Sequence, residues 1–596
     1  MILNVDDFDD CDYTADCEND LARHVNMVHQ LIIRPFSTDE IEEALKRCDS
    51  RAKGVNGYSQ FDLKGIKSTI VPALKVIFNN ALIEKSFPSE FLSNHVIFIH
   101  KGGEMEDPIN YRMISIQNPI LKIFMSLLQT RLLGKLEANG SLPETQFGFR
   151  SKRSTLSACF TLNKLIQNKF NEGKKLFCLF VDYKRAFASI NRKLLYEKMN
   201  SIGLSRGFIQ LISEIYKDTK LFIRGSDGSL SKEFATRIGL PEGCAASTVM
   251  FSVFIADIGS FLPKSGVPLK DDADNSYIVK YLAYADDMAI LSEDEGSFRE
   301  SLSDLEKYCK ENCLLLNVVK TKIIIFSRGR PKTHDPFQLN NEEVKIEKTF
   351  KYLGIIFSVG GSFNEHVKAQ VTKATSRIGY LYGKLNLRNL NLELVRKVFS
   401  VYVEPIITYG LAIWYDGLGK NSLLMINAVW TKFLKLWLGI PMASINSFVH
   451  QYTNTIPLSV WFNEALFDKF WLNLQLPHLK GMIFDKKDLK GKDLKPYFEE
   501  IPTFMWMNRI SYRPPTEKNL RKKIALEIFG WEHSDLCSNK KFHVPYLHGD
   551  GTGAYDYSHD NRKTREYCTC EVCGDKMTWN HKLFCNSTNN TDLDLI

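Results

Sequence analysis

The sequence contains no apolar run close to the roughly twenty residues that a membrane-spanning helix needs. Its first twenty residues hold eight Asp or Glu and no Lys or Arg, so they lack the basic start and apolar segment of a secretory signal peptide. Thirteen cysteines in a chain without a secretion signal favour free thiols in a reducing compartment over a disulfide framework. We therefore expect an intracellular protein without a membrane partner.

A strong charge of either sign is also missing. Lys and Arg outnumber Asp and Glu by 77 to 69, and the net charge of +8 suits a nucleic-acid groove without requiring one. The apolar content of 44% and the charged content of 24% are ordinary for a globular protein, so we expect disorder only at the ends. A chain of 596 residues is too long for one core and predicts roughly three or four folded units.

The sequence does contain two adjacent carboxylates between apolar strands. Residues 277–283 and 288–291 are predicted strands, and Tyr284-Ala285-Asp286-Asp287 is a very tight turn between them. A second apolar run, Leu176–Val181, ends directly in Asp182. Three acids at two strand ends can hold two Mg2+ ions, with phosphate oxygens and water completing the coordination. The alternative is an ordinary polar turn and an ordinary strand end.

Further short motifs occur in a fixed order around these acids. They are Lys53-Gly54-Val55-Asn56-Gly57-Tyr58, His100-Lys101-Gly102-Gly103, Asp107-Pro108-Ile109-Asn110-Tyr111-Arg112, Gln146-Phe147-Gly148-Phe149-Arg150, Phe180-Val181-Asp182-Tyr183-Lys184-Arg185-Ala186-Phe187, Gly239-Leu240-Pro241-Glu242-Gly243, Asn317 to Lys322 and Tyr352-Leu353-Gly354. Together they resemble the reverse transcriptase domain of non-LTR (LINE-type) retrotransposons, particularly the jockey-like elements. The resemblance runs from about Lys53 to about Pro441 and continues more weakly to the C-terminus. Each motif alone is weakly specific, and the ordered series carries the resemblance.

The resemblance implies an RNA-directed DNA polymerase that uses two Mg2+ or Mn2+ ions. Its partners would be an RNA template, a DNA primer or genomic target DNA, and deoxynucleoside triphosphates, in the cytoplasm and nucleus. By the same resemblance Asp182 and Asp286 bind both metals, and Asp287 supports them. One metal would lower the pKa of the primer 3′-hydroxyl, and the other would neutralise charge as pyrophosphate leaves.

The resemblance also places three residues beside the incoming nucleotide. Phe187 takes the place of a bulky gate whose ring would clash with a 2′-hydroxyl; a core aromatic is the alternative. Lys101 and Arg112 fall where the fingers reach the triphosphate, a task that suits Arg because its planar fork binds phosphate oxygens in pairs. The alternative for each cation is a solvated surface charge.

Several positions depart from the family pattern. Glu242 and Gly243 lie in a turn that resembles the element under the templating base pair, where glutamine is usual at position 242. A carboxylate facing a triphosphate adds repulsion on the order of 1 kcal/mol or more. Ala188 stands where the family usually has a second acid. Met113 replaces a proline or glycine, and Thr248 replaces a proline. Intact catalytic acids with eroded neighbours indicate a divergent active copy or an element in decay.

Template and primer contacts are implied at three further places. Gly148-Phe149-Arg150 would let backbone approach the template, since glycine adds no side chain. Tyr352-Leu353-Gly354 would be the hairpin that grips the primer end. Lys320 and Lys322 fall near the place of a cationic proton donor for pyrophosphate; lysines before an exposed strand are the alternative.

The C-terminal end carries a separate Cys/His signal. Cys570, Cys573, His581 and Cys585 have spacings that a tetrahedral Zn2+ accepts, and Cys568 is a spare thiol. The pattern resembles the small module that follows the polymerase in many non-LTR elements. The alternative is a group of unpaired cysteines in a frayed tail.

Helix signals occur at several places. Ser37 to Glu40 predicts a capping box, Pro119 opens a long amphipathic helix that ends near Gly140, and Ser297 to Glu300 predicts another helix start. Residues 364–438 read as helices.

The predicted fold class is α+β, with a right-hand arrangement of fingers, palm and thumb, a helical C-terminal extension and a small zinc module. The predicted boundaries are an acidic tail at 1–36, a fingers-rich part at 37–175, a palm at 176–357, a helical thumb at 358–445, a connector at 446–560, and a zinc-knuckle-like module with a tail at 561–596.

Two rival functions stay open. A viral RNA-dependent RNA polymerase shares the palm but fits poorly with Phe187 as a sugar gate. A catalytically inactive, decayed or domesticated nucleic-acid-binding protein would keep the fold, and Glu242 and Ala188 favour it. The family often encodes an endonuclease upstream, which does not fit before Lys53, so we expect a truncated copy or a fragment of a longer reading frame.

Overall fold

The computed structural model describes residues 32–453 apart from 226, 271–275, 330–332 and 416–417, together with 455 and 458. The chain divides into two units, Met1–Tyr512 and Arg513–Ile596, and every described residue belongs to the first. Most of the predicted acidic tail and connector lies outside the described residues, as do the predicted zinc ligands Cys570, Cys573, His581 and Cys585. In the part that is described, helices that are both long and apolar enough to cross a membrane do not occur.

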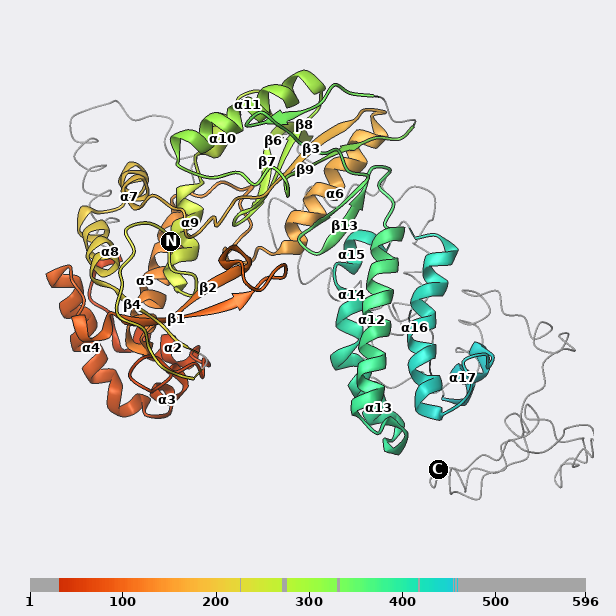
Figure 1. The fold of residues 1–596 in the computed structure, drawn as a ribbon, viewed down its shortest axis with the longest axis horizontal. Coiled ribbons are helices and arrows are strands. Elements are labelled where there is room, and N and C mark those ends of the chain that lie inside the picture. The colour runs from red at the N-terminus through yellow and green to blue at the C-terminus, as the bar shows by residue number, and fades with distance from the viewer. Residues whose placement is uncertain are drawn as a thin grey trace, which may run out of the picture. The chain divides into compact units, whose positions relative to one another are not determined.

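The first part of the chain combines helices with a three-stranded sheet (Figure 1). Its elements are α2 (Thr38–Lys46), α3 (Gln60–Gly65), α4 (Lys67–Glu84), η2 (Ser89–Phe91), β1 (Ser93–His100), η3 (Pro108–Asn110), β2 (Tyr111–Ile116), α5 (Pro119–Ala138) and β4 (Lys220–Ile223). β1 pairs antiparallel with β2 and parallel with β4. The capping box is confirmed at Ser37 and Glu40. α5 opens on Pro119 as predicted, but it is buried on most sides instead of along one face, so it is a central helix.

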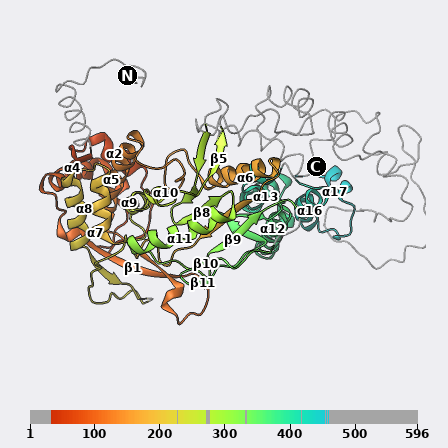
Figure 2. The ribbon, with the colours of Figure 1, turned by 90° about the horizontal axis from the view of Figure 1, so that it is seen from above.

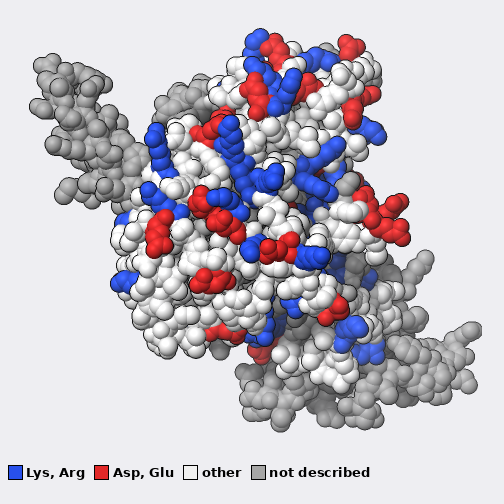
Figure 3. All heavy atoms as spheres, turned by 60° about the vertical axis from the view of Figure 1, so that its left-hand side comes forward, with Lys and Arg blue, Asp and Glu red and all other residues white. Residues whose placement is uncertain are grey.

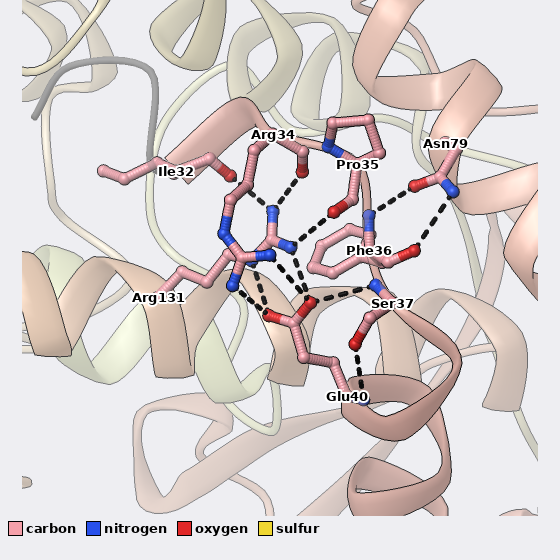
Figure 4. A network of polar contacts seen from close by, with 8 residues as sticks. All are labelled: Ile32, Arg34, Pro35, Phe36, Ser37, Glu40, Asn79 and Arg131. Carbon is pink, nitrogen blue, oxygen red and sulfur yellow. Dashed lines mark hydrogen bonds and ion pairs between the residues drawn. The ribbon is translucent and has the colours of Figure 1, made fainter. Parts of the chain in front are cut away.

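A buried arginine joins the start of the described chain to α5 (Figure 4). The Arg131 guanidinium lies 3.8 Å from the centre of the Phe36 ring, and its side chain is 8% exposed. It donates hydrogen bonds to the Glu40 carboxylate and to three backbone oxygens, those of Ile32, Arg34 and Pro35. Because a buried guanidinium needs its donors satisfied, this network fixes the chain before α2 against α5.

A four-stranded antiparallel sheet lies at the centre, in the order β7-β8-β3-β9. The strands are β3 (Leu176–Val181), β7 (Tyr281–Tyr284), β8 (Asp287–Ser292) and β9 (Lys322–Phe326). All six residues of β3 are buried, and alternate side chains enter two different cores. One core includes α9 (Ala245–Phe254) and α11 (Glu295–Glu311), which runs along β8 (Figure 2); the other includes α6 (Thr155–Asn171). The sheet is therefore covered on both faces, and its chemistry is confined to its edge.

Two boundary predictions are wrong. The strand predicted over residues 277–283 is broken at Lys280, because β6 (Ser276–Val279) pairs with β5 (Val267–Lys270) whereas β7 joins the central sheet. The N-cap of α11 is Asp294, three residues before the predicted cap Ser297, because the Asp294 side chain accepts the Ser297 N–H at 2.9 Å. The remaining elements of this part are α7 (Arg192–Ser201), α8 (Arg206–Asp218), α10 (Ile258–Phe261), β10 (Gln338–Leu339) and β11 (Glu342–Glu343).

A hairpin and a group of helices follow the sheet. They are β12 (Thr349–Tyr352), β13 (Ile355–Ser358), α12 (Asn364–Lys384), η4 (Leu387–Asn389), α13 (Leu392–Tyr402), α14 (Glu404–Thr408), α15 (Leu411–Trp414), α16 (Lys420–Leu438) and α17 (Asn446–Tyr452). α12 packs against α16 and α14. The helical prediction for residues 364–438 is confirmed, and the whole has the mixed helix and sheet content of an α+β fold.

Figure 3 shows the charges on one face of the molecule. Lys and Arg side chains are interleaved there with Asp and Glu side chains. The modest net charge is therefore not gathered into a single-sign field on that face.

Candidate active site

The double-aspartate turn is the link between β7 and β8. Tyr284 pairs with Asp287 across the hairpin, which leaves Ala285 and Asp286 as its two-residue turn. Ala285 has a φ of +58°, a conformation that places the chain reversal directly before Asp286. Asp286 thus lies at the tip, and Asp287 is the first residue of β8.

Asp182 lies at the same edge of the sheet. β3 and β8 pair with Val181 opposite Met288, and continuing this register by one residue sets Asp182 opposite Asp287. The Asp182 N–H donates to Thr321 Oγ1 at 3.1 Å, and the Asp182 carbonyl accepts the Asn317 N–H at 2.8 Å. The backbone is therefore held by the segment before β9, and the three predicted carboxylates meet at one sheet edge.

These carboxylates destabilise one another in the ionised form. Burial, followed by the charge of Asp182, raises the pKa of Asp286, while Arg112 and Lys101 oppose the rise. Burial and the charges of Asp286 and Asp182 raise the pKa of Asp287 from 3.8 to about 6. Asp287 as a whole residue remains exposed. The part of its pKa shift that comes from the charges of Asp286 and Asp182 is the part that a bound cation would cancel.

A divalent cation fits this donor set. Within the described residues no three His, Cys, Asp or Glu side chains converge as a complete metal site. Mg2+ does not require one, because it is commonly bound through one or two carboxylates with substrate phosphates and water as the other ligands. Two or three repelling carboxylate groups that form no ion pair with any described residue suit such a cation.

Metal-free protein is expected to become more stable as the pH falls from 7.5 to 5, and Asp287→Asn should remove part of that gain. A carboxyl with a pKa of about 6 when folded and near 3.8 when unfolded takes up its proton first in the folded state. The ionised group therefore costs its full amount of stability above pH 6, and this cost shrinks as the pH falls from about 6 toward the unfolded value of 3.8. Thermal unfolding in a chelator should show the variant above the native chain at pH 7.5, with a clearly smaller difference between the two proteins at pH 5. Equal pH slopes for the two proteins would contradict the assignment.

Phe187 lies beside the turn that precedes α9. Its ring stacks on Phe251 with centroids 4.5 Å apart and planes at 18°, and the side chain is half-buried. The Phe187 carbonyl accepts the Leu240 N–H at 2.7 Å. The ring is thus held by a core aromatic and the backbone of Phe187 by the 239–243 turn, a rigid placement that both the gate and the core interpretation require.

Lys101 and Arg112 lie on the hairpin of β1 and β2. Arg112 is opposite Ile99, and the Lys101 N–H donates to the Asn110 carbonyl at 2.7 Å, which continues the pairing. Side chains at 99 and 101 share one face of the hairpin, so the register puts both cations on that face. Both lower the pKa of Asp286, so both charges lie near enough to act on that carboxylate.

The unusual Glu242 is paired with one of these cations. Its Oε2 lies 3.2 Å from Arg112 Nε. Burial is the largest cause of the raised pKa of Glu242, and Asp286 adds to it. Gly243, with a φ of +112°, follows in the turn. The carboxylate therefore faces the same space as the acids and the two cations.

Gly148 lies against the double-aspartate turn, which the predicted role of Asp286 makes the candidate catalytic turn. A Cβ at this position would be 2.4 Å from the Ala285 nitrogen, which real side chains do not tolerate. The Phe147 N–H donates to the Ala283 carbonyl at 2.7 Å, and Gln146 forms a single parallel bridge with Ala283, so this short segment, called the added strand below, runs beside β7. The close approach that glycine permits here is to the backbone of the double-aspartate turn, and a contact between this segment and a template stays a prediction.

Arg150 is turned inward. Its side chain is 2% exposed and pairs with Glu137 of α5, and its Nη1 donates to the Pro143 carbonyl at 2.6 Å. Its side chain therefore holds the loop to α5, and the template contact predicted for the backbone of this segment stays a prediction. Phe149 is 38% exposed with its ring 6.1 Å from that of Tyr284, so it keeps the predicted access to nucleic acid.

The predicted primer hairpin forms. Leu353 and Gly354 have φ values of +46° and +92° and make the two-residue turn between β12 and β13. Tyr352 is buried and donates to the Leu282 carbonyl of β7 at 3.2 Å, and the Tyr409 hydroxyl donates to the Leu353 carbonyl at 2.7 Å. The hairpin is thereby fixed to the sheet and to the helices after it. Its contact with a primer stays a prediction.

The two lysines before β9 differ in position. Lys322 pairs with Phe180 inside the sheet and is half-buried. Lys320 is exposed, and its N–H donates to the Asn317 carbonyl at 3.1 Å. The same Asn317 binds Asp182, so Lys320 is joined to the acidic edge through one residue, and the predicted proton-donor role stays open for both.

Sequence reasoning assigned no role to Gln146. Its buried Oε1 accepts N–H groups from Gly148 at 2.9 Å and from Ala285 at 3.1 Å, so one side chain joins the added strand to the catalytic turn. Gln146 belongs to the motif at residues 146–150. An amide side chain two residues before a glycine is the sequence signal that could have indicated this role, because a buried amide needs hydrogen-bond partners.

Comparisons with known proteins agree with this geometry. Residues 99–357 match the family described as reverse transcriptase (RNA-dependent DNA polymerase). The chain is 27% identical to the probable RNA-directed DNA polymerase from transposon BS of Drosophila melanogaster, over 64% of this chain and 42% of that protein. It is 24% identical to the RNA-directed DNA polymerase from mobile element jockey of the same species, over 62% of this chain and 40% of the relative.

A third relative is the Retrovirus-related Pol polyprotein from type-1 retrotransposable element R2 of Popillia japonica. It is 23% identical over 55% of this chain and 46% of its own length. The chain therefore spans less than half the length of these relatives.

Proposed function

Residues 99–357 are a reverse transcriptase domain related to those of non-LTR retrotransposons, and from this premise we propose that the chain is an RNA-directed DNA polymerase. It extends a DNA 3′ end on an RNA template with deoxynucleoside triphosphates. The observation that carries the proposal is the register that sets Asp182 opposite Asp287, with Asp286 at the adjoining tip.

We assign two Mg2+ ions to Asp182 and Asp286, with Asp287 beside them. When bound, the metals supply charge neutralisation and lower the pKa of the primer hydroxyl. The residues of the chain position the substrates: Lys101 and Arg112 bind the triphosphate, and Phe187 excludes the 2′-hydroxyl. The hairpin at 352–354 supports the primer end, and Lys320 or Lys322 protonates pyrophosphate.

The same proposal assigns the parts of a right-hand polymerase. The helices and sheet around β1 and β2 are the fingers, the four-stranded sheet is the palm, and α12 to α16 are the thumb. A thumb in this position would contact the primer–template by its shape and backbone.

Primer extension tests the proposal. A labelled DNA primer on an RNA template is expected to grow in Mg2+ with deoxynucleotides and to stay unextended in a chelator. Extension by ribonucleotides from an RNA primer would instead favour the RNA polymerase. If the folded protein binds the primer–template but does not extend the primer, the result would favour the catalytically silent binder.

The silent binder is the second candidate because of one contact, the ion pair between Arg112 and Glu242. It occupies a cation that the triphosphate would need. Ala188, in place of the family's second acid, adds to this case.

Phe187→Val is expected to raise the use of ribonucleotides relative to deoxynucleotides by about tenfold or more, because a smaller side chain leaves room for a 2′-hydroxyl. The ratio of the two kcat/KM values measures it. Phe261→Val is the matched control. The half-buried Phe261 ring lies outside the site and packs on Tyr308, with the two ring centroids 5.0 Å apart. Equal ratios in the two variants would make Phe187 an ordinary core aromatic.

We propose that Cys570, Cys573, His581 and Cys585 bind one Zn2+, which would order a segment too small to build its own core. Elemental analysis should find one zinc per chain, lost in Cys573→Ala. The proposal also includes a location in the cytoplasm and nucleus. It further includes genomic DNA as the target.

A further inference from the structure

Arg112 and Glu242 form an ion pair between two separate parts of the site. Arg112 Nε is 3.2 Å from Glu242 Oε2, and the side chains are 58% and 25% exposed. An exposed pair of this kind contributes little to stability, roughly 0 to 1 kcal/mol. Its effect on function is larger if either partner is needed by a ligand.

The backbone around Glu242 brings the pair together. The Ser115 N–H of β2 donates to the Glu242 carbonyl at 2.7 Å. A Cβ on Gly243 would lie 2.5 Å from the Ser115 carbonyl oxygen, so only glycine lets the turn come this close to β2. The carboxylate is thus held beside the strand that carries Arg112.

Four charged groups face one space. Arg112 and Lys101 lower the pKa of Asp286 and also that of Glu242, while Asp286 raises that of Glu242 after the larger effect of burial. These charges therefore couple the β1–β2 hairpin and Glu242 electrostatically to the double-aspartate turn. A triphosphate bound by the two cations beside Asp286 would have to enter the gap between these charges.

We propose that Glu242 sets the affinity for the incoming nucleotide by occupying Arg112 until a triphosphate displaces it. The inference rests on the proposed function, because it takes the ligand of this gap to be a nucleoside triphosphate. A bound carboxylate and a phosphate use the same donors of a guanidinium, so the two compete for Arg112. Glutamine of the same size carries no charge and would leave the guanidinium to the nucleotide.

Equilibrium nucleotide binding is the test. The full chain is bound to an RNA template and a DNA primer ending in a dideoxynucleotide, with Ca2+ in place of Mg2+, and the Kd for the next deoxynucleotide is measured. Glu242→Gln is expected to tighten binding about three- to tenfold. Glu300→Gln is the matched control, because Glu300 pairs with Lys264 at 2.6 Å outside the site, and it should leave the Kd unchanged.

A double-mutant cycle separates competition for Arg112 from simple repulsion. In an Arg112→Ala background, Glu242→Gln should tighten binding by less than about twofold. An undiminished gain there, or weaker binding by the single Glu242→Gln variant, would overturn the proposal. Native protein that extends primers while Glu242→Gln leaves the Kd unchanged would overturn this inference alone. Nucleotide binding that obeys the cycle without any primer extension would overturn only the proposed catalysis.

Discussion

Asp286→Asn is expected to lower the rate of primer extension by about a thousandfold or more while making the metal-free protein slightly more resistant to heat. The amide keeps the shape of the side chain but removes the carboxylate that we propose as a ligand of both metals, and electrostatic stabilisation of this kind is among the largest contributions to catalysis. Burial and Asp182 raise the pKa of Asp286, so the ionised group is held in the fold at a cost. Removing its charge relieves that cost.

Two measurements on the same preparation check this prediction. Single-turnover extension in Mg2+ gives the rate, and thermal unfolding in a chelator gives a melting temperature expected to rise by about 2 °C. Asp304→Asn, which neutralises an aspartate of α11 whose pKa is also raised, should leave extension unchanged. Extension within tenfold of the native rate would remove Asp286 from the catalytic centre. A lower melting temperature would mean that its carboxylate has a structural partner.

The sequence predicted those parts of the site that lie on one continuous segment. An apolar run that ends in Asp182 and a tight turn at Asp286 each follow from local periodicity, and both lie where they were expected. The start of α2 at its capping box and of α5 at Pro119 depend only on neighbouring residues, and these were also found. Local patterns determine such features because the energies involved act within a few residues.

Contacts between distant segments could not be predicted in the same way. The inward turn of Arg150 depends on Glu137 of α5, and the pairing of Arg112 with Glu242 joins residues 130 positions apart. The break at Lys280 arises because β6 finds a different partner strand from β7. In each case the local pattern permits several outcomes, and tertiary packing selects one.

The catalytic turn itself depends on such a distant contact. Gly148 lies against the Ala285 backbone, and Gln146 Oε1 accepts the Ala285 N–H at 3.1 Å. The position of Asp286 is therefore set by a segment 138 residues earlier in the chain as well as by its own hairpin. A change in this segment should act on catalysis without touching any acid.

Gly148→Ala is accordingly expected to lower the rate of extension about a hundredfold. The new Cβ would lie 2.4 Å from the Ala285 nitrogen and 3.0 Å from the Tyr284 carbonyl carbon, both of them backbone atoms, so the turn or the added strand must shift. Displacement of a reacting group by about 1 Å is enough for a loss of that size. Single-turnover extension measures it, with primer–template binding as a check that the fold persists.

Gly134→Ala in α5 is the matched control for this substitution. A Cβ there meets nothing within 4 Å, and alanine in an exposed helix position gains up to about 1 kcal/mol over glycine. We expect native extension and equal or higher stability from the control, against slow extension from Gly148→Ala with primer–template binding retained. If Gly148→Ala extended primers within threefold of the native rate, the turn would not depend on the added strand. Asp286 would then owe its position to the β7–β8 hairpin alone.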